Sequence, residues 1–87
     1  FSSLEELYVN DNLLTDLSSL ASLPYLSVLI LSDNPKLQDM NTFIKIGEAG
    51  YGSSLTLLNI VHTSYTEEQV LQLQQFFPDC EIISDYS

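Results

Sequence analysis

The stretch Leu4-Glu5-Glu6-Leu7-Tyr8-Val9-Asn10-Asp11-Asn12-Leu13-Leu14 decides the fold, because its spacing of apolar residues returns twice along the chain. Residues 26–34 repeat it as Leu-Ser-Val-Leu-Ile-Leu-Ser-Asp-Asn, and residues 55–63 repeat it more loosely as Leu-Thr-Leu-Leu-Asn-Ile-Val-His-Thr. Written as a template, the pattern is L-x-x-L-x-L-x-x-N-x-L. A spacing that recurs with a period of about 20–50 residues is typical of stacked coils.

Each copy predicts a short β-strand with one buried face. Its fourth and sixth positions, such as Leu29 and Leu31, are two residues apart and therefore point to the same side of a strand. The first two copies begin 22 residues apart, at Leu4 and Leu26, which suits a strand plus a return segment rather than a hairpin. Three parallel strands are therefore expected, with Leu29 of the central strand among the most buried residues.

The template asparagines predict a ladder of side-chain hydrogen bonds at the ends of the strands. Asn12 and Asn34 follow the first two strands, where an amide can satisfy backbone groups that turn inward and lose water. Thr63 takes this place in the third copy, so the ladder is expected to weaken there. Leu37 arrives one residue later than the template requires, and we still expect it to point inward.

The segments between the strands are expected to cover the opposite side of the sheet. Residues 15–24 predict a helical turn with Leu17, Leu20 and Leu23 facing inward and Pro24 ending it. A second short helix is predicted from Met40, Phe43, Ile44 and Ile46. Residues 47–54 then read as an exposed loop, in which Tyr51 is either a contact residue or part of a simple spacer.

The third copy leads into a longer predicted helix. Thr66 and Gln69 have the spacing of a capping box, and Pro78 ends the helix. Its apolar stripe is predicted to consist of Val70, Leu73, Phe76 and Phe77. Residues 80–83 are expected to form a short final strand fragment with Cys80 buried, and residues 84–87 a polar tail.

Composition narrows the class of protein. The 87 residues allow one small domain, with coils at about 4–25, 26–54 and 55–83. Two Lys+Arg against twelve Asp+Glu give a net charge of −10, which argues against nucleic acid and anionic membranes. It indicates either a solvated acidic surface that favours solubility or a basic protein partner. A lone cysteine excludes an internal disulfide. No apolar run is long enough for membrane insertion, and no motif indicates a cofactor.

Residues 4–83 resemble leucine-rich-repeat proteins, whose fold is an α/β solenoid with a parallel sheet on the concave side and helical or irregular segments on the convex side. The first coil is similar to the short coils of internalin-type bacterial surface proteins and of protein phosphatase-1 regulators. The ending from Thr66 to Ile82 is similar to the terminal coils of bacterial repeat proteins. The resemblance implies a non-enzymatic protein that binds on its concave face. The chain is expected to be a single such domain or the C-terminal fragment of a longer array.

The predicted register also defines a candidate partner-binding site on the concave face. Outward residues of neighbouring strands should form rows, namely Glu6/Val28/Leu57, Tyr8/Ile30/Asn59 and Asn10/Ser32/Val61. Apolar residues run diagonally across these rows, with acidic residues at the rim, which is typical of interaction surfaces. The alternatives are that strand propensity alone explains them, or that a neighbouring domain covers them. The candidate residues are Glu6, Tyr8, Val28, Ile30, Asp33, Leu57, Asn59 and Val61.

A further row, Asp11/Asp33/His62, has the residue types of a metal site or an acid–base pair. These positions begin the turn after each strand, where Asp and Asn are favoured for backbone reasons, so we interpret them as turn residues. No catalytic or metal-binding residues are therefore predicted.

Two functions remain open. One is a protein-interaction module or scaffold, and the other is a structural end-coil that closes a longer solenoid whose binding coils lie elsewhere. The bacterial-type ending favours a secreted or cell-surface protein, whereas the phosphatase-regulator resemblance favours the cytosol. The compartment, the partner and the oligomeric state stay unknown at this stage.

Overall fold

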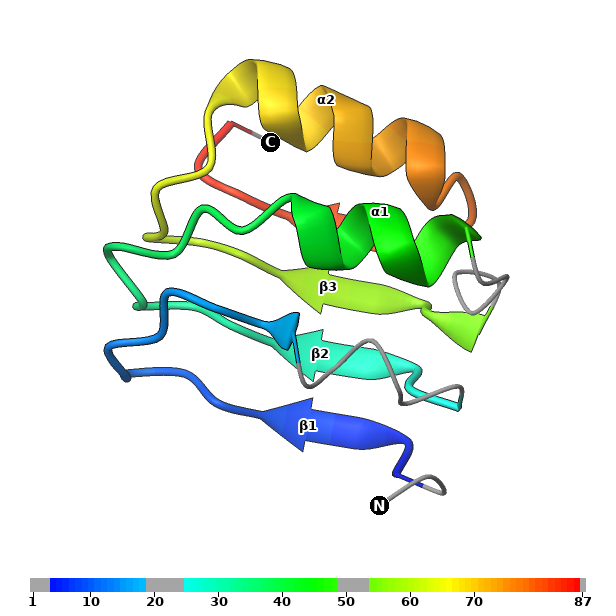
Figure 1. Cartoon of the computed structure of the whole chain (residues 1–87), viewed down its shortest axis with the longest axis horizontal. Coiled ribbons are helices and arrows are strands. Elements are labelled where there is room, and N and C mark those ends of the chain that lie inside the picture. Colours follow the sequence, from blue (N-terminus) through cyan, green and yellow to red (C-terminus); the bar gives the residue numbers. More distant parts are fainter. Residues whose placement is uncertain (1–3, 19–24, 49–53, 87) are drawn as a thin grey trace.

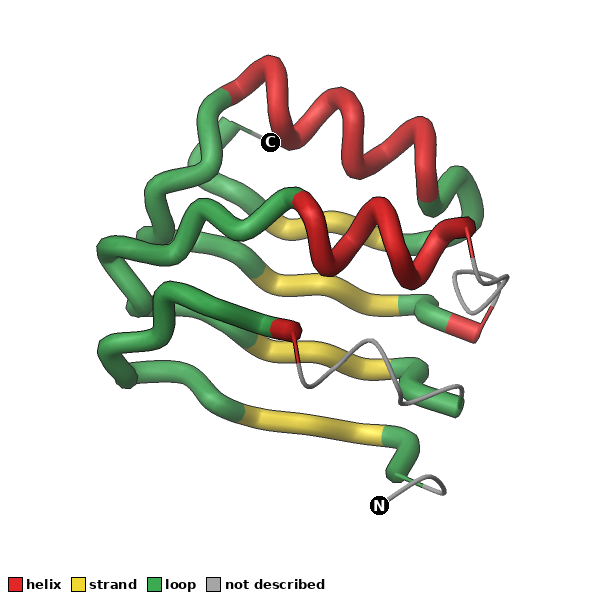
Figure 2. Tube along the Cα trace, viewed as in Figure 1, coloured by secondary structure: helices red, strands yellow, loops and turns green. Residues whose placement is uncertain are grey.

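The computed structural model describes residues 4–18, 25–48 and 54–86. Over these residues the chain forms one parallel sheet in the order β1-β2-β3-β4, with two helices on one side of it (Figures 1 and 2). The elements in chain order are β1 (Glu6–Tyr8), β2 (Val28–Ile30), α1 (Asn41–Glu48), β3 (Leu57–Asn59), α2 (Glu67–Phe76) and β4 (Glu81–Ile83). The α/β repeat architecture predicted from the leucine spacing is confirmed.

The strands pair in register, so that equivalent template positions lie side by side. Leu7 pairs with Leu29, Leu29 with Leu58, and Leu58 with Ile82. Leu29 and Leu58 of the two central strands are 0% exposed, whereas Leu7 and Ile82 of the two edge strands are only partly buried. An inward residue is therefore fully removed from water only when a coil lies on each side of it.

The sheet has a fourth strand where the sequence predicted three strands and a terminal fragment. β4 pairs with β3 over three residues, and Ile60 N donates a 2.8 Å hydrogen bond to Ile83 O. Cys80 is buried, as predicted, and this burial, together with the nearby charge of Glu81, raises the pKa of its thiol to about 11. The last coil thus adds a fourth strand to the sheet, which does not end at β3.

Asn34 links the first two coils from inside the protein. Its side chain is 0% exposed, and its Nδ2 donates to Val9 O at 3.1 Å and to Leu31 O at 2.8 Å. Its Oδ1 accepts a hydrogen bond from Leu14 N at 3.1 Å. Thr63, at the same template position in the third coil, donates to Ile60 O within its own coil. The predicted weakening of the ladder is therefore seen.

The helices α1 and α2 lie on one side of the sheet and close the core there. Phe43 of α1 is fully buried, and its ring centroid lies 6.1 Å from that of Tyr65 and 6.1 Å from that of Phe77. The prediction for the residues after Ile46 was partly wrong, because Gly47 and Glu48 are the last turn of α1 and not loop. The helix therefore extends two residues beyond Ile46, its last buried residue.

α2 begins at the predicted capping box. Thr66 Oγ1 accepts a hydrogen bond from Gln69 N, and Gln69 Oε1 accepts one from Thr66 N. Leu73 and Phe77 are buried as predicted, but Phe76 is 42% exposed and was wrongly assigned to the apolar stripe. It precedes the cap residue Phe77, whose ring takes the inward position and packs against that of Phe76.

Some predicted features lie outside the described residues. These are the inward positions of Leu20 and Leu23, the stop at Pro24, and the loop residue Tyr51. Leu17 is described and is buried, and Leu37 is also buried, both as predicted.

Replacing Leu29 with alanine tests the buried register. Because Leu29 is fully buried between two coils, we expect Leu29→Ala to lower the free energy of unfolding by about 2–5 kcal/mol, the usual cost of a large-to-small core change. Chemical denaturation followed by circular dichroism would measure it. A loss below about 0.5 kcal/mol would place Leu29 outside the core and contradict the register.

Candidate functional site

The face of the sheet that points away from α1 and α2 carries the predicted site; we call it the strand face (Figure 1). Pairing in register places the outward residues in rows. The first row is Glu6, Val28, Leu57 and Glu81, and the second is Tyr8, Ile30, Asn59 and Ile83. Two of the three predicted rows are therefore present in the paired strands, and β4 lengthens each by one residue.

The structure brings the predicted site residues together as a half-buried apolar strip with a polar border. Val28, Ile30 and Leu57 are half-buried, because neighbouring side chains about 4.8 Å away shield part of each. Tyr8, at the β1 edge, is 60% exposed. Asn59 and Val61 are half-buried as well, whereas Glu6 and Asp33 are exposed.

Two of the polar side chains on this face are held in place. The Tyr8 hydroxyl donates to Glu6 Oε1 at 3.4 Å, which agrees with both side chains lying on the same face of β1. Asn59 Oδ1 accepts a hydrogen bond from Val61 N at 3.1 Å, so this amide is tied to the end of its own strand. Tyr8 and Asn59 thus each make one local hydrogen bond at the border of the apolar strip.

Sequence reasoning missed Glu81 and Ile83 as members of this face. The signal was present in the alternation of residues 80–83, in which Cys80 and Ile82 face the core and Glu81 and Ile83 face outward. Only two inward apolar residues support that strand, so the pattern is shorter than in the other coils. Asp85 was also missed, because it had been assigned to a polar tail.

The turn after each of the first three strands has a left-handed residue at the same repeat position. Asp11, Asp33 and His62 have φ values of 58°, 61° and 60°. Asp, Asn and His adopt this conformation more readily than most residues, and the short polar side chain of Asp can bond locally. The turn interpretation of these three residues therefore accounts for their spacing.

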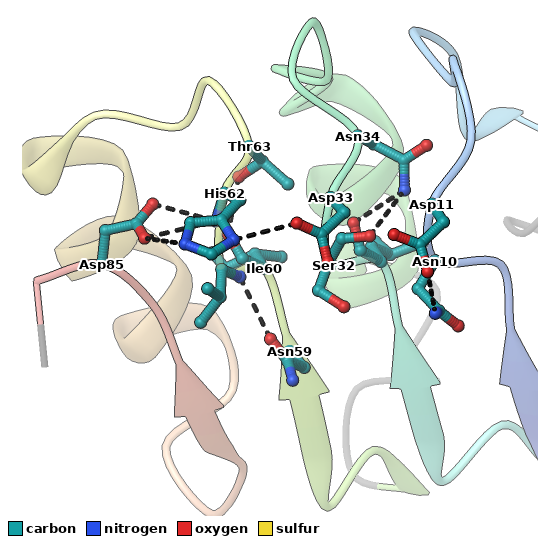
Figure 3. A network of polar contacts seen from close by, with 12 residues as sticks. Asn10, Asp11, Ser32, Asp33, Asn34, Asn59, Ile60, His62, Thr63 and Asp85 are labelled. Atoms are coloured by element: carbon teal, nitrogen blue, oxygen red, sulfur yellow. Dashed lines mark hydrogen bonds and ion pairs between the residues drawn. The ribbon is translucent and has the colours of Figure 1, made fainter.

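His62 joins two neighbouring coils through its ring and its backbone (Figure 3). Its Nδ1 lies 2.9 Å from Asp33 Oδ1, and its backbone N donates to Asp85 Oδ2 at 3.0 Å. The hydrogen bond to Asp33 raises the pKa of His62 above its ordinary value; desolvation opposes this shift, and the charges of Asp33 and Asp85 add to it. Asp85, which lies outside the row Asp11/Asp33/His62, is the second acidic contact of His62.

These groups do not form a metal centre in the part of the chain that the structure describes. No cluster of three or more His, Cys, Asp or Glu side chains within residues 4–18, 25–48 and 54–86 could hold a metal ion. Within the same residues, no helix is long and apolar enough to cross a membrane.

A polar hollow lies beside the start of α1, away from the strand rows. It contains Lys36 and Lys45, which are the two lysines of a sequence without arginine, together with Asp16 and Asp39. Burial raises the pKa of Asp39, but hydrogen bonds donated by Leu17 and Thr42 outweigh it and leave the pKa below its ordinary value. The two carboxylates balance the two ammonium groups, so the hollow has no net charge with which to attract an ion.

The stacked parallel coils with leucines at equivalent inward positions define a repeat solenoid. The family described as Leucine Rich repeats (2 copies) matches residues 2–45, just over half of the chain, and the chain therefore belongs to the leucine-rich-repeat family. No curated protein matches it. Domains of this family generally mediate protein–protein interaction and are typically not enzymes. The similarity to internalins or phosphatase regulators is not tested by this match and stays a prediction.

The His62 contacts predict a measurable titration. An NMR titration of the single histidine should give a pKa above its ordinary value of 6.5, and Asp33→Asn should lower this pKa. Because the folded-state pKa is raised, the contact stabilises the protein below the unfolded pKa, and this stabilisation is lost as the pH rises through the folded pKa.

Asp11→Asn is the matched control, since Asp11 has the same turn position and its carboxylate bonds Asn10 instead. The pKa of His62 should therefore be higher in the Asp11→Asn variant than in the Asp33→Asn variant. Equal pKa values in the two variants would show that the Asp33 contact is not formed in solution.

Proposed function

We propose that the chain is a non-enzymatic protein-interaction module whose partner docks on the strand face, which is the predicted concave side. The observation that carries this proposal is the apolar strip of Val28, Ile30 and Leu57, which the two helices leave uncovered. Monomeric proteins rarely expose large apolar patches, and such patches with a polar border mark interaction surfaces.

Ile30 is the centre of the proposed contact. It lies on an inner strand, with Tyr8 on one side and Asn59 on the other, so a docked partner would remove it from water more fully than the edge residues. Central apolar and aromatic residues usually dominate binding energy, while the surrounding ring mainly excludes water. Tyr8 supplies a large exposed ring next to it.

The second candidate function is an end-coil that closes a longer solenoid. The observation that favours it is the uneven burial of the coils, because Leu7, Val9 and Leu14 of the first coil are only partly buried. Leu13 is 84% exposed. A further coil stacked on β1 would cover these residues, since each repeat buries its core against its neighbours.

The two functions differ in which residues matter. An end-coil needs the β1 edge, whereas an interaction module needs the strand face. If Leu13→Ser and Leu14→Ser abolish assembly with a separately expressed leucine-rich-repeat segment and Ile30→Asp does not, the end-coil function is favoured.

Replacing Ile30 with aspartate tests the interaction module. The side chain points away from the core, so Ile30→Asp should shift the thermal midpoint by only a few degrees while it abolishes capture of the partner bound by the wild-type protein. Tyr8→Ala should weaken capture in the same assay. Calorimetry and affinity capture with quantitative mass spectrometry would measure the two effects.

Glu67→Lys is the control, because Glu67 lies on α2 on the other side of the sheet. It should not reduce capture. Unchanged capture by Ile30→Asp and Tyr8→Ala together would show that the partner binds elsewhere.

A further inference from the structure

The first row of the strand face has an acidic side chain at each end. Glu6 and Glu81 lie on the two edge strands, and Val28 and Leu57 lie between them. Neighbouring strands are about 4.8 Å apart, so the two glutamate backbones are separated by about 14 Å. Only the addition of β4 to the sheet makes the row symmetrical in this way.

Among the residues that the structure describes, no lysine or histidine forms an ion pair with these two carboxylates. The two lysines of the chain, Lys36 and Lys45, lie beside the start of α1, where Asp16 and Asp39 share the same hollow. Among the residues that the structure describes, the outward positions of the four strands carry no lysine or arginine. Glu6 and Glu81 are both exposed and so are available to a basic partner.

The centre of the row favours an apolar group. Val28 and Leu57 are both half-buried, and their neighbours Ile30 and Ile83 extend the apolar surface along the strands. An apolar side chain placed over Val28 and Leu57 would lie about 7 Å from either end of the row, given the same strand spacing. Along the row, a partner would therefore meet an acidic side chain, then an apolar surface, and then a second acidic side chain.

An extended peptide has the matching geometry. Alternate side chains of an extended segment point to the same side, and the rise of about 3.3 Å per residue separates positions i, i+2 and i+4 by about 6.6 Å each. Side chains at i and i+4 are then about 13 Å apart. In a helix the same two positions are only about 6 Å apart, so they could not reach both glutamates.

We infer that the strand face binds an extended protein segment that crosses the four strands, with basic residues at positions i and i+4 and an apolar residue at i+2. The basic residues pair with Glu6 and Glu81, and the apolar residue packs on Val28 and Leu57. This inference rests on the proposed function, because it specifies the partner of the same face.

Two synthetic peptides of equal composition test the spacing. The first has a Lys-Ser-Leu-Ser-Lys core, and the second has the same residues in the order Lys-Lys-Leu-Ser-Ser. Both would be titrated into the isotopically labelled 87-residue chain and followed by the backbone amide shifts of β1 to β4. The spaced peptide should bind roughly 1.5- to 5-fold more tightly, because only it reaches both carboxylates and an exposed ion pair contributes a factor of this size.

Charge-removing variants identify the carboxylates. Glu6→Gln and Glu81→Gln should each weaken binding of the spaced peptide roughly 1.5- to 5-fold, and added salt should do the same in the wild type. Glu68→Gln is the matched control, since it removes one exposed acidic charge on α2 and should have no such effect.

The outcomes separate this inference from the proposed function. Equal binding of the two peptides, an equal effect of Glu68→Gln, or no binding would overturn the inference, while the Ile30→Asp capture experiment would still decide the proposed function. Shifts confined to α1 and α2, together with unchanged binding to Ile30→Asp, would overturn both.

Discussion

In-register pairing of four three-residue strands is the constraint on which the rest of the structure depends. It places Leu29 and Leu58 between two coils each and thereby forms the core. The same register places the alternate strand residues on the opposite face of the sheet. The core and the candidate site are therefore consequences of one alignment. Asn34 supports it from within, because its buried amide bonds the backbone of the preceding coil at Val9 and Leu14. A shift by one residue would leave that amide unsatisfied and expose the leucines.

The repeat spacing was enough to predict most of this fold, because leucine positions two apart in a strand and about one coil apart in the chain allow few arrangements. The same reasoning failed where the local pattern was short or where the partner was distant. Glu81 and Ile83 were missed because the last strand has few inward apolar residues. Asp85 was missed because its contact with His62 spans 23 residues and no local pattern records it. Phe76 was assigned to the core because periodicity does not show which of two adjacent rings turns inward.

Charge is distributed unevenly with respect to the two faces of the sheet. Both lysines lie beside the start of α1, whereas the strand face and the turns after it carry Glu6, Glu81, Asp33 and Asp85. His62 is held between two of these carboxylates. The net charge of −10 was visible in the sequence, but the placement of Glu6 and Glu81 at the two ends of one row depends on the position of β4. Protonation of His62 would reduce the negative field at the turn edge without altering Glu6 or Glu81.

The register can be measured directly by NMR scalar couplings across hydrogen bonds. We expect couplings from the Leu31 amide nitrogen to the Asn59 carbonyl carbon and from the Ile60 amide nitrogen to the Ile83 carbonyl carbon, since each pair is joined by a 2.8 Å backbone hydrogen bond. These two couplings would establish β2, β3 and β4 as one ladder, with Val28, Leu57 and Glu81 in the same row. Couplings displaced by one residue, or the lack of any coupling between Ile60 and β4, would contradict the shared alignment of the core and the strand face.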